Sequence, residues 1–183
     1  ITGGSFDGRT HAISFEESVG SSSRVTLTNV TAAGAAGTSG SGANFEKQVS
    51  ASTVAVRGGT FTGGACGLRF AGALSASASV SVAGGSFTGG ELGFSITGGP
   101  SAGCSITVDG AAFSGTERAL LVQGTLAGAV SIRGGTFAAE TSGVTCIAFY
   151  CVTTGSIAVA RATIHGGAYA LWVHNAQSSD IAI

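Results

Sequence analysis

Apolar and small polar residues alternate along this chain in short runs that recur at a nearly constant interval. A clear example begins at Val54 and reads Val-Ala-Val-Arg-Gly-Gly-Thr-Phe. The first residues of this run and of its weaker or partial copies are Val25, Val54, Val80, Ile106, Val130, Ile157 and Ile181. Alternation with a period of two indicates a strand with one buried face. Recurrence every 24 to 29 residues indicates a solenoid in which each copy belongs to one coil.

A second alternating run follows each copy about seven residues after the Phe position. Its apolar pairs are Ile13/Phe15, Ala43/Phe45, Leu68/Phe70, Phe94/Ile96, Leu120/Val122, Ile147/Phe149 and Leu171/Val173. The pairs at Ala43 and Ile147 need short insertions to join the alignment. All ten Phe residues then fall on inward positions, and one stacked column is expected from Phe6, Phe61, Phe87, Phe113 and Phe137. The Gly-Gly pair before Phe is expected to turn the corner between the two strands, because Gly accepts positive φ.

These two runs predict an all-β fold, a right-handed parallel β-helix of about seven coils. The chain opens and closes inside a copy of the repeat, at Ile1 and Ile183, and neither end carries the polar cap that a solenoid needs. We therefore expect residues 1–183 to be a single segment, uncapped at both ends, of a longer chain. End-to-end stacking of segments into a filament is the alternative explanation.

Charge is scarce and balanced, with 8 Lys and Arg residues against 9 Asp and Glu residues. This balance excludes the basic surface expected of a nucleic-acid-binding protein. No apolar run reaches the roughly 18 residues of a membrane-spanning helix, so membrane insertion is not expected in this segment. Asp109 and Arg133 occupy the same outward position on neighbouring coils and are expected to form a weak surface ion pair.

Two groups of residues are candidate sites. Glu91, Glu117 and Glu140 fall at one corner of three consecutive coils, and Arg118 adjoins the second of them. Stacked carboxylates repel one another and can recruit a cation such as Ca²⁺. The alternative is that the three carboxylates are solvated turn residues that point apart.

The second group is aromatic. Trp172, Tyr150 and His174 point outward on neighbouring coils, with Leu121 below them. Such an exposed patch can stack on a sugar ring or contact another protein. The alternative is that a further loop or domain of the parent chain covers it.

Weaker signals change this picture little. The outward Ser and Thr residues before the Phe column form short Thr-x-Thr units that are interrupted on other coils, as at Asp7 and Ala33, so hydroxyl ladders are expected rather than an ice-binding array. Asn29-Val30-Thr31 is a sequon for N-glycosylation. Cys66 and Cys104 are expected to be free thiols, while a Cys146–Cys151 bridge is left open. No metal-binding or Ser-His-Asp grouping is found.

The Val-x-Val-x-Gly-Gly-Ser/Thr-Phe repeat resembles right-handed parallel β-helix repeat proteins of the pectate-lyase-like superfamily, over essentially the whole chain. The resemblance implies the fold and not the chemistry, because the paired aspartates of its polygalacturonases are missing and Lys47 stands alone. The Gly-Gly-Ser-Phe-Thr-Gly-Gly style also resembles large protist surface proteins, such as the trypanosome dispersed-gene-family proteins. That second resemblance implies a surface or adhesive role without catalysis.

The sequence thus predicts a structural or adhesive module of a large extracellular or cell-surface protein or filament, without enzymatic activity, cofactor or metal. Its expected partners are other coils or domains of the parent chain, end-to-end copies, or glycans. A carbohydrate-active fragment similar to polysaccharide lyases, acting through the acidic corner, is one alternative. An ice-binding solenoid is the other.

Overall fold

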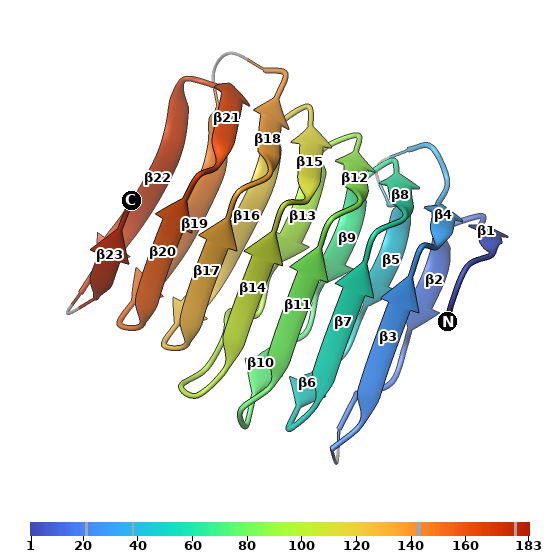
Figure 1. Ribbon diagram of the computed structural model, residues 1–183, viewed down its shortest axis with the longest axis horizontal. Helices are drawn as coiled ribbons and strands as arrows, with labels where there is room; N and C mark the ends of the chain where they lie inside the picture. Colours follow the sequence, from blue (N-terminus) through green and yellow to red (C-terminus); the bar gives the residue numbers. More distant parts are fainter. Residues whose placement is uncertain (21, 38, 142–143, 178) are drawn as a thin grey trace.

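Three long parallel sheets wind around one apolar core in the computed structural model, which describes residues 1–20, 22–37, 39–141, 144–177 and 179–183 (Figure 1). The described residues form strands and turns and contain no helix. Each sheet has seven strands, and each strand pairs with the equivalent strand of the next coil. The predicted all-β parallel solenoid of about seven coils is confirmed, while its right-handed winding stays a prediction.

Every coil contributes one strand to each long sheet (Figure 1). Sheet A contains β3 (Arg24–Thr28), β7 (Thr53–Arg57), β11 (Ser79–Ala83), β14 (Ser105–Asp109), β17 (Ala129–Arg133), β20 (Ser156–Ala160) and β23 (Asp180–Ala182). Sheet B contains β1 (Ser5–Asp7), β4 (Thr31–Ala33), β8 (Thr60–Gly63), β12 (Ser86–Gly89), β15 (Ala112–Gly115), β18 (Thr136–Ala139) and β21 (Thr163–Gly166). Sheet C contains β2 (His11–Phe15), β5 (Ser41–Phe45), β9 (Cys66–Phe70), β13 (Leu92–Ile96), β16 (Arg118–Leu126), β19 (Thr145–Thr153) and β22 (Tyr169–Ala176). A small fourth sheet joins β6 (Val49–Ser50) to β10 (Leu74–Ser75).

The register matches the repeat. Val54 pairs with Val80, and the other predicted copy starts pair in the same way along sheet A, from Val25 to Ile181. The two inserted alignments are also correct, because Phe45 pairs with Phe15 and Phe70, and Ile147 pairs with Leu120 and Leu171. Like residues therefore lie above one another, about 4.8 Å apart.

Stacked Phe rings fill the core. The ring centroids of Phe61 and Phe87 are 5.0 Å apart, those of Phe87 and Phe113 are 4.9 Å apart, and Phe137 continues the column at 5.3 Å. The expectation that Phe6 belongs to this ladder is wrong, because Ala32 occupies the intervening coil and separates it from Phe61. A second ladder runs inside sheet C from Phe15 through Phe45 to Phe70, with centroids 4.4 and 4.5 Å apart.

Glycine turns the corner between sheets A and B as predicted. Gly58 and Gly59 have φ of 63° and 90°, in the left-handed region that side chains disfavour. A Cβ on Gly59 would lie 2.3 Å from the carbonyl oxygen of Val30 on the preceding coil. At the first corner position of that coil, Asn29 adopts φ of 51°, a conformation that Asn tolerates better than most residues.

An irregularity at the start of each strand of sheet C decides which side chains reach its outer surface. Gly67 faces sheet B, since a Cβ there would lie 2.7 Å from the amide nitrogen of Thr88, and the next residue, Leu68, is also fully buried in the core. Two consecutive inward residues reverse the usual alternation, as in a β-bulge. Cys66 and Arg69 consequently both face outward, where they line one cavity.

All four cysteines are buried free thiols. This agrees with the expectation for Cys66 and Cys104, and it excludes the Cys146–Cys151 bridge that the sequence left open. The side chain of Cys146 lies against sheet B, near the backbone of Ala139 and His165, whereas the sulfur of Cys151 lies 3.4 Å from the hydroxyl of Thr153.

Candidate functional site

The outer surfaces of sheets A and B carry mostly Ser, Thr, Ala and Gly. Single hydroxyl hydrogen bonds link neighbouring coils, since Ser114 donates to Thr88 at 3.1 Å on sheet B, in the column that follows Phe, and Ser105 donates to Ser79 at 3.2 Å on sheet A. Short hydroxyl side chains make these surfaces flat and offer few groups that can surround a ligand.

Sheet C has a different outer surface, which we call face C. The only Trp and both Tyr residues of the chain lie on it, on strands β19 and β22. Tyr150 and Trp172 are each 37% exposed, and Tyr169 is 55% exposed. Among the described residues, all Trp and Tyr side chains therefore lie on face C.

The aromatic patch predicted from the sequence forms on face C. Tyr150 and His174 occupy paired positions with ring centroids 6.4 Å apart, and Trp172 pairs with Ala148 beside them. Leu121, two coils away from Trp172 in the same column, is buried and borders the patch.

Two further members of the aromatic patch, Arg118 and Tyr169, are not apparent from the sequence. The Arg118 guanidinium lies 5.2 Å from the centroid of the Tyr150 ring, a cation–π geometry. The ring of Tyr169 lies 5.0 Å from that of Trp172. Both residues occupy the strand position before the irregularity in sheet C, and strict alternation would have pointed them inward.

The predicted acidic corner forms only in part. The backbone amide of Glu117 donates to the carbonyl of Glu91, so these two residues stack, but the amide of Glu140 donates to Gly115 and is displaced by one residue. The carboxylate of Glu117 pairs with Arg118 at 3.2 Å. Among the described residues, no group of three His, Cys, Asp or Glu side chains is close enough to hold a metal ion.

Glu91 instead lines a cavity of about 280 Å³ over β9, β13 and β16, which we call the polar pocket. Its lining residues are Ala65, Cys66, Arg69, Glu91, Leu92, Ser95, Thr97, Leu121 and Gln123. Leu121 also borders the aromatic patch, so the two sites are continuous along face C. The polar pocket is not apparent from the sequence, because Cys66 and Arg69 share it only through the irregularity at Gly67.

Burial raises the pKa of the Cys66 thiol to about 11, and the nearby charges of Arg69 and Glu91 act on it in opposite directions. A thiol with so high a pKa is protonated at neutral pH and is a poor nucleophile. Cys66 is thus a lining residue of the polar pocket and not a reactive group.

Unpartnered polar atoms also concentrate on the strands of sheet C. In the part of the chain that the structure describes, four buried side-chain atoms lack a hydrogen-bond partner: His11 Nδ1, Ser41 Oγ, Asn44 Oδ1 and Arg118 Nε. A buried polar atom without a partner costs about 1–3 kcal/mol. All four atoms belong to sheet C, three of them on β2 and β5 of the first two coils and the fourth on β16, where Arg118 lies against Tyr150.

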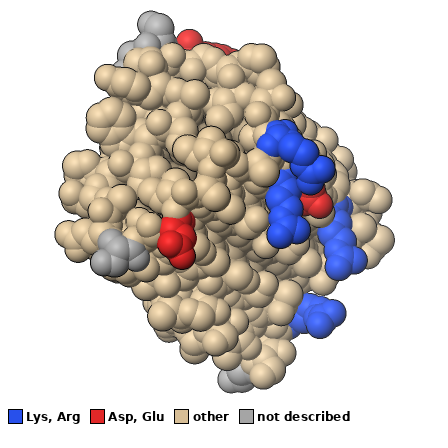
Figure 2. Space-filling view, turned by 60° about the vertical axis from the view of Figure 1, so that its left-hand side comes forward, with Lys and Arg blue, Asp and Glu red and all other residues tan. Residues whose placement is uncertain are grey.

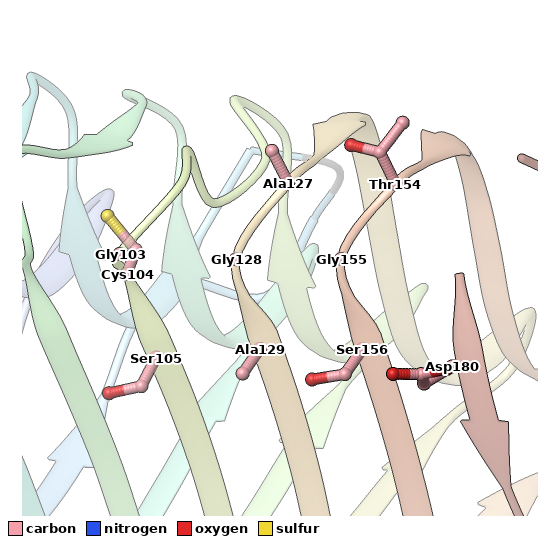
Figure 3. A pocket seen from close by; sticks show the side chains of 10 residues that line it. All are labelled: Gly103, Cys104, Ser105, Ala127, Gly128, Ala129, Thr154, Gly155, Ser156 and Asp180. Atoms are coloured by element: carbon pink, nitrogen blue, oxygen red, sulfur yellow. The ribbon is translucent and has the colours of Figure 1, made fainter. Parts of the chain in front are cut away.

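A larger cavity of about 490 Å³ lies at the corner between sheets C and A. Figure 3 shows that Ser105, Ala129, Ser156 and Asp180 stand in a row there on neighbouring strands, below corners built from small residues. Asp180 is its single charged residue. This cavity has space for a ligand but only one charged side chain that could bind it.

Charges elsewhere are sparse. Figure 2 shows basic side chains gathered on one side of the view, with most of the displayed surface uncharged. Asp109 and Arg133 are paired in register on sheet A, but the predicted ion pair does not form, since their charged atoms do not come within 4.0 Å. The described residues contain no helix long and apolar enough to cross a membrane.

Asn29, the predicted glycosylation site, is exposed at the corner between sheets A and B. Its modification stays a prediction.

No protein-family model matches the chain, and neither the curated proteins nor the solved structures contain a significant match to it.

Proposed function

We propose that this chain is a non-catalytic adhesive module, a segment of an extracellular or cell-surface protein that binds a glycan along face C. The observation that carries the proposal is the coincidence of two features on one sheet. The exposed Tyr and Trp side chains and the polar pocket both lie on sheet C.

Glycan chemistry fits this combination. The apolar face of a sugar ring stacks on Trp or Tyr, and its hydroxyls accept and donate hydrogen bonds to groups such as Arg, Glu and Gln. The aromatic patch supplies Trp172 and Tyr150, and the polar pocket supplies Arg69, Glu91 and Gln123. Because consecutive strands are about 4.8 Å apart, Trp172 on β22 lies about 14 Å along face C from β13 of the polar pocket, so a glycan of several units can contact both sites.

Composition and resemblance support a location outside the cell. The low charge, the Gly-rich and Ser-rich repeats and the sequon at Asn29 are compatible with a surface protein. The resemblance to pectate-lyase-like repeats and to protist surface proteins adds to this. Since Glu91 and Glu117 stack but Glu140 is displaced by one residue, nothing in their arrangement favours the lyase alternative over adhesion.

A glycan array with the purified chain tests the proposal. We expect selective binding, and we expect Trp172→Ala and Tyr150→Ala each to weaken it about tenfold, as the loss of one stacking contact implies. Arg133→Ala on sheet A is the matched control and should bind as the wild type does. Absence of binding to every glycan, or an equal loss in the control, contradicts glycan adhesion.

A further inference from the structure

The polar pocket contains two opposite charges that no other side chain in the described residues neutralises. Arg69 and Glu91 are both half-buried, and both line the cavity. The ion pair found among the described residues joins Arg118 to Glu117 and involves neither Arg69 nor Glu91. Neither the Arg69 guanidinium nor the Glu91 carboxylate has a side-chain hydrogen bond in the described structure.

The two charges approach the cavity from different elements. Arg69 is on β9 and pairs in register with Ser95, whereas Glu91 lies in the turn that leads into β13. Both charges act on the pKa of the Cys66 thiol, as expected for a residue that lines the same cavity. Ser95 and Leu121, both nearly inaccessible, extend the lining between the neighbouring strands.

This arrangement selects ligands by charge. A simple anion would gain from Arg69 but meet the like charge of Glu91, and a simple cation would meet the reverse. A ligand that carries both charges can pair with each group, and Arg pairs especially well with a carboxylate because the guanidinium donates two parallel hydrogen bonds. The cavity, at about 280 Å³, lies just below the range of about 300–1,000 Å³ for ligand pockets, so it suits a single unit and not a long chain.

We propose that the polar pocket binds a zwitterionic group, with the ligand carboxylate on Arg69 and its ammonium on Glu91. This inference deepens the proposed function, because it rests on face C being the binding surface and specifies the charge of the unit that it selects. An amino sugar bearing a carboxylate and the end of an amino acid or peptide share this chemistry.

Isothermal titration calorimetry at low salt with matched small ligands tests the charge rule. Muramic acid carries both charges on a sugar ring, N-acetylmuramic acid keeps only the carboxylate, and glucosamine keeps only the ammonium. We expect the wild-type chain to bind muramic acid at least tenfold more tightly than either singly charged analogue. L-leucine carries both charges without a sugar ring: affinity equal to that of muramic acid supports an amino-acid or peptide end, and weaker affinity supports an amino sugar.

Two substitutions predict a change of preference that a structural role would not produce. Arg69→Gln keeps only the charge of Glu91, so glucosamine should then bind more tightly than N-acetylmuramic acid. Glu91→Gln keeps only the charge of Arg69, so N-acetylmuramic acid should then bind more tightly than glucosamine. Arg133→Gln, on sheet A, is the control and should keep the wild-type order. Circular dichroism establishes that each variant is folded, and if one is not, the wild-type order of ligands still decides.

The proposal is overturned if the wild type binds no zwitterion, or binds N-acetylmuramic acid or glucosamine as tightly as muramic acid. The glycan array separates this outcome from failure of glycan adhesion, because the array measures binding of whole glycans to face C, whereas the calorimetry measures the charge preference of the polar pocket. If the glycan array is negative but the small ligands bind in the predicted order, the proposal for the polar pocket is retained and glycan adhesion is rejected. If the array is positive but the predicted order is not found, glycan adhesion is retained and the proposal for the pocket is rejected.

Discussion

At the scale of single residues, the corner glycines show two separate effects. Gly59 has positive φ and no room for a side chain, because a Cβ would meet the backbone of Val30. Gly84 has a similar positive φ of 64°, but a Cβ there would meet nothing within 4 Å. The same residue type is therefore required for conformation alone at one corner and for conformation plus close packing at the other.

Substitution by alanine separates these effects. Gly84→Ala should lower the free energy of unfolding by about 1–2 kcal/mol, the strain of a left-handed conformation with a Cβ. Gly59→Ala adds a backbone clash and should lower it by at least about twice that amount. Urea unfolding of the two variants measures the difference, and equal losses would contradict the close approach of neighbouring coils at Gly59.

Cys66 predicts a pH dependence of stability. Its pKa is about 11 in the folded chain against an ordinary value of 9.0. Below pH 9 both states hold the proton, but between pH 9 and 11 the unfolded chain loses it first, so stability falls as pH rises. The loss attributable to Cys66 should approach about 2–3 kcal/mol by pH 11. Comparing urea unfolding of the wild type and Cys66→Ala across this range isolates it, and parallel curves would contradict the prediction.

At the scale of elements, stacked Phe rings connect each strand with those of neighbouring coils. Phe87 lies between Phe61 and Phe113 and is fully buried. Phe87→Ala should lower the free energy of unfolding by about 3–5 kcal/mol, since it removes contacts with both neighbouring rings and leaves a cavity. Thr88→Ala, at the adjacent exposed position of β12, is the control and should change stability by less than about 0.5 kcal/mol. Calorimetric or urea unfolding measures both.

The strands and their register were predictable because alternation and repetition depend on local sequence and on the like residues that stack between coils. The first residues of the predicted copies, such as Val80 and Ile106, pair as the repeat implies. The Phe6 assignment failed because one coil replaces the ring by Ala32, which breaks the column without disturbing the alternation. Ala32 at the Phe position is visible in the sequence, and because it has no ring it leaves Phe6 two coils from Phe61.

The polar pocket was beyond sequence reasoning for a different reason. Its assembly depends on the irregularity at Gly67, which turns Cys66 outward against strict alternation. It also depends on the side-chain directions of Arg69 and Glu91, which come from different elements. The aromatic patch was easier to predict, because Tyr150, Trp172 and His174 lie in the regularly alternating parts of β19 and β22, before the register shift that follows Tyr150.

At the scale of the whole molecule, one coil is the structural unit. Val80 and Ile106 are register partners, so removal of residues 80–105 would join Ser79 to a residue that matches its lost neighbour. We expect this variant to keep its β-sheet circular dichroism and to shorten by about 4.8 Å, as measured by small-angle X-ray scattering. Removal of residues 80–92 would place a sheet C strand in sheet A, and this control should not fold. Loss of structure in both deletions would contradict the modular coil.

The pairing of every long strand with a strand one coil away also bears on how the chain folds. Each new contact closes a loop of nearly the same length, whatever the total number of coils, so the entropy lost at each step stays almost constant. Once a first pair of coils has nucleated, growth resembles the closing of a zipper, with each added turn adopting the order already present in its neighbour.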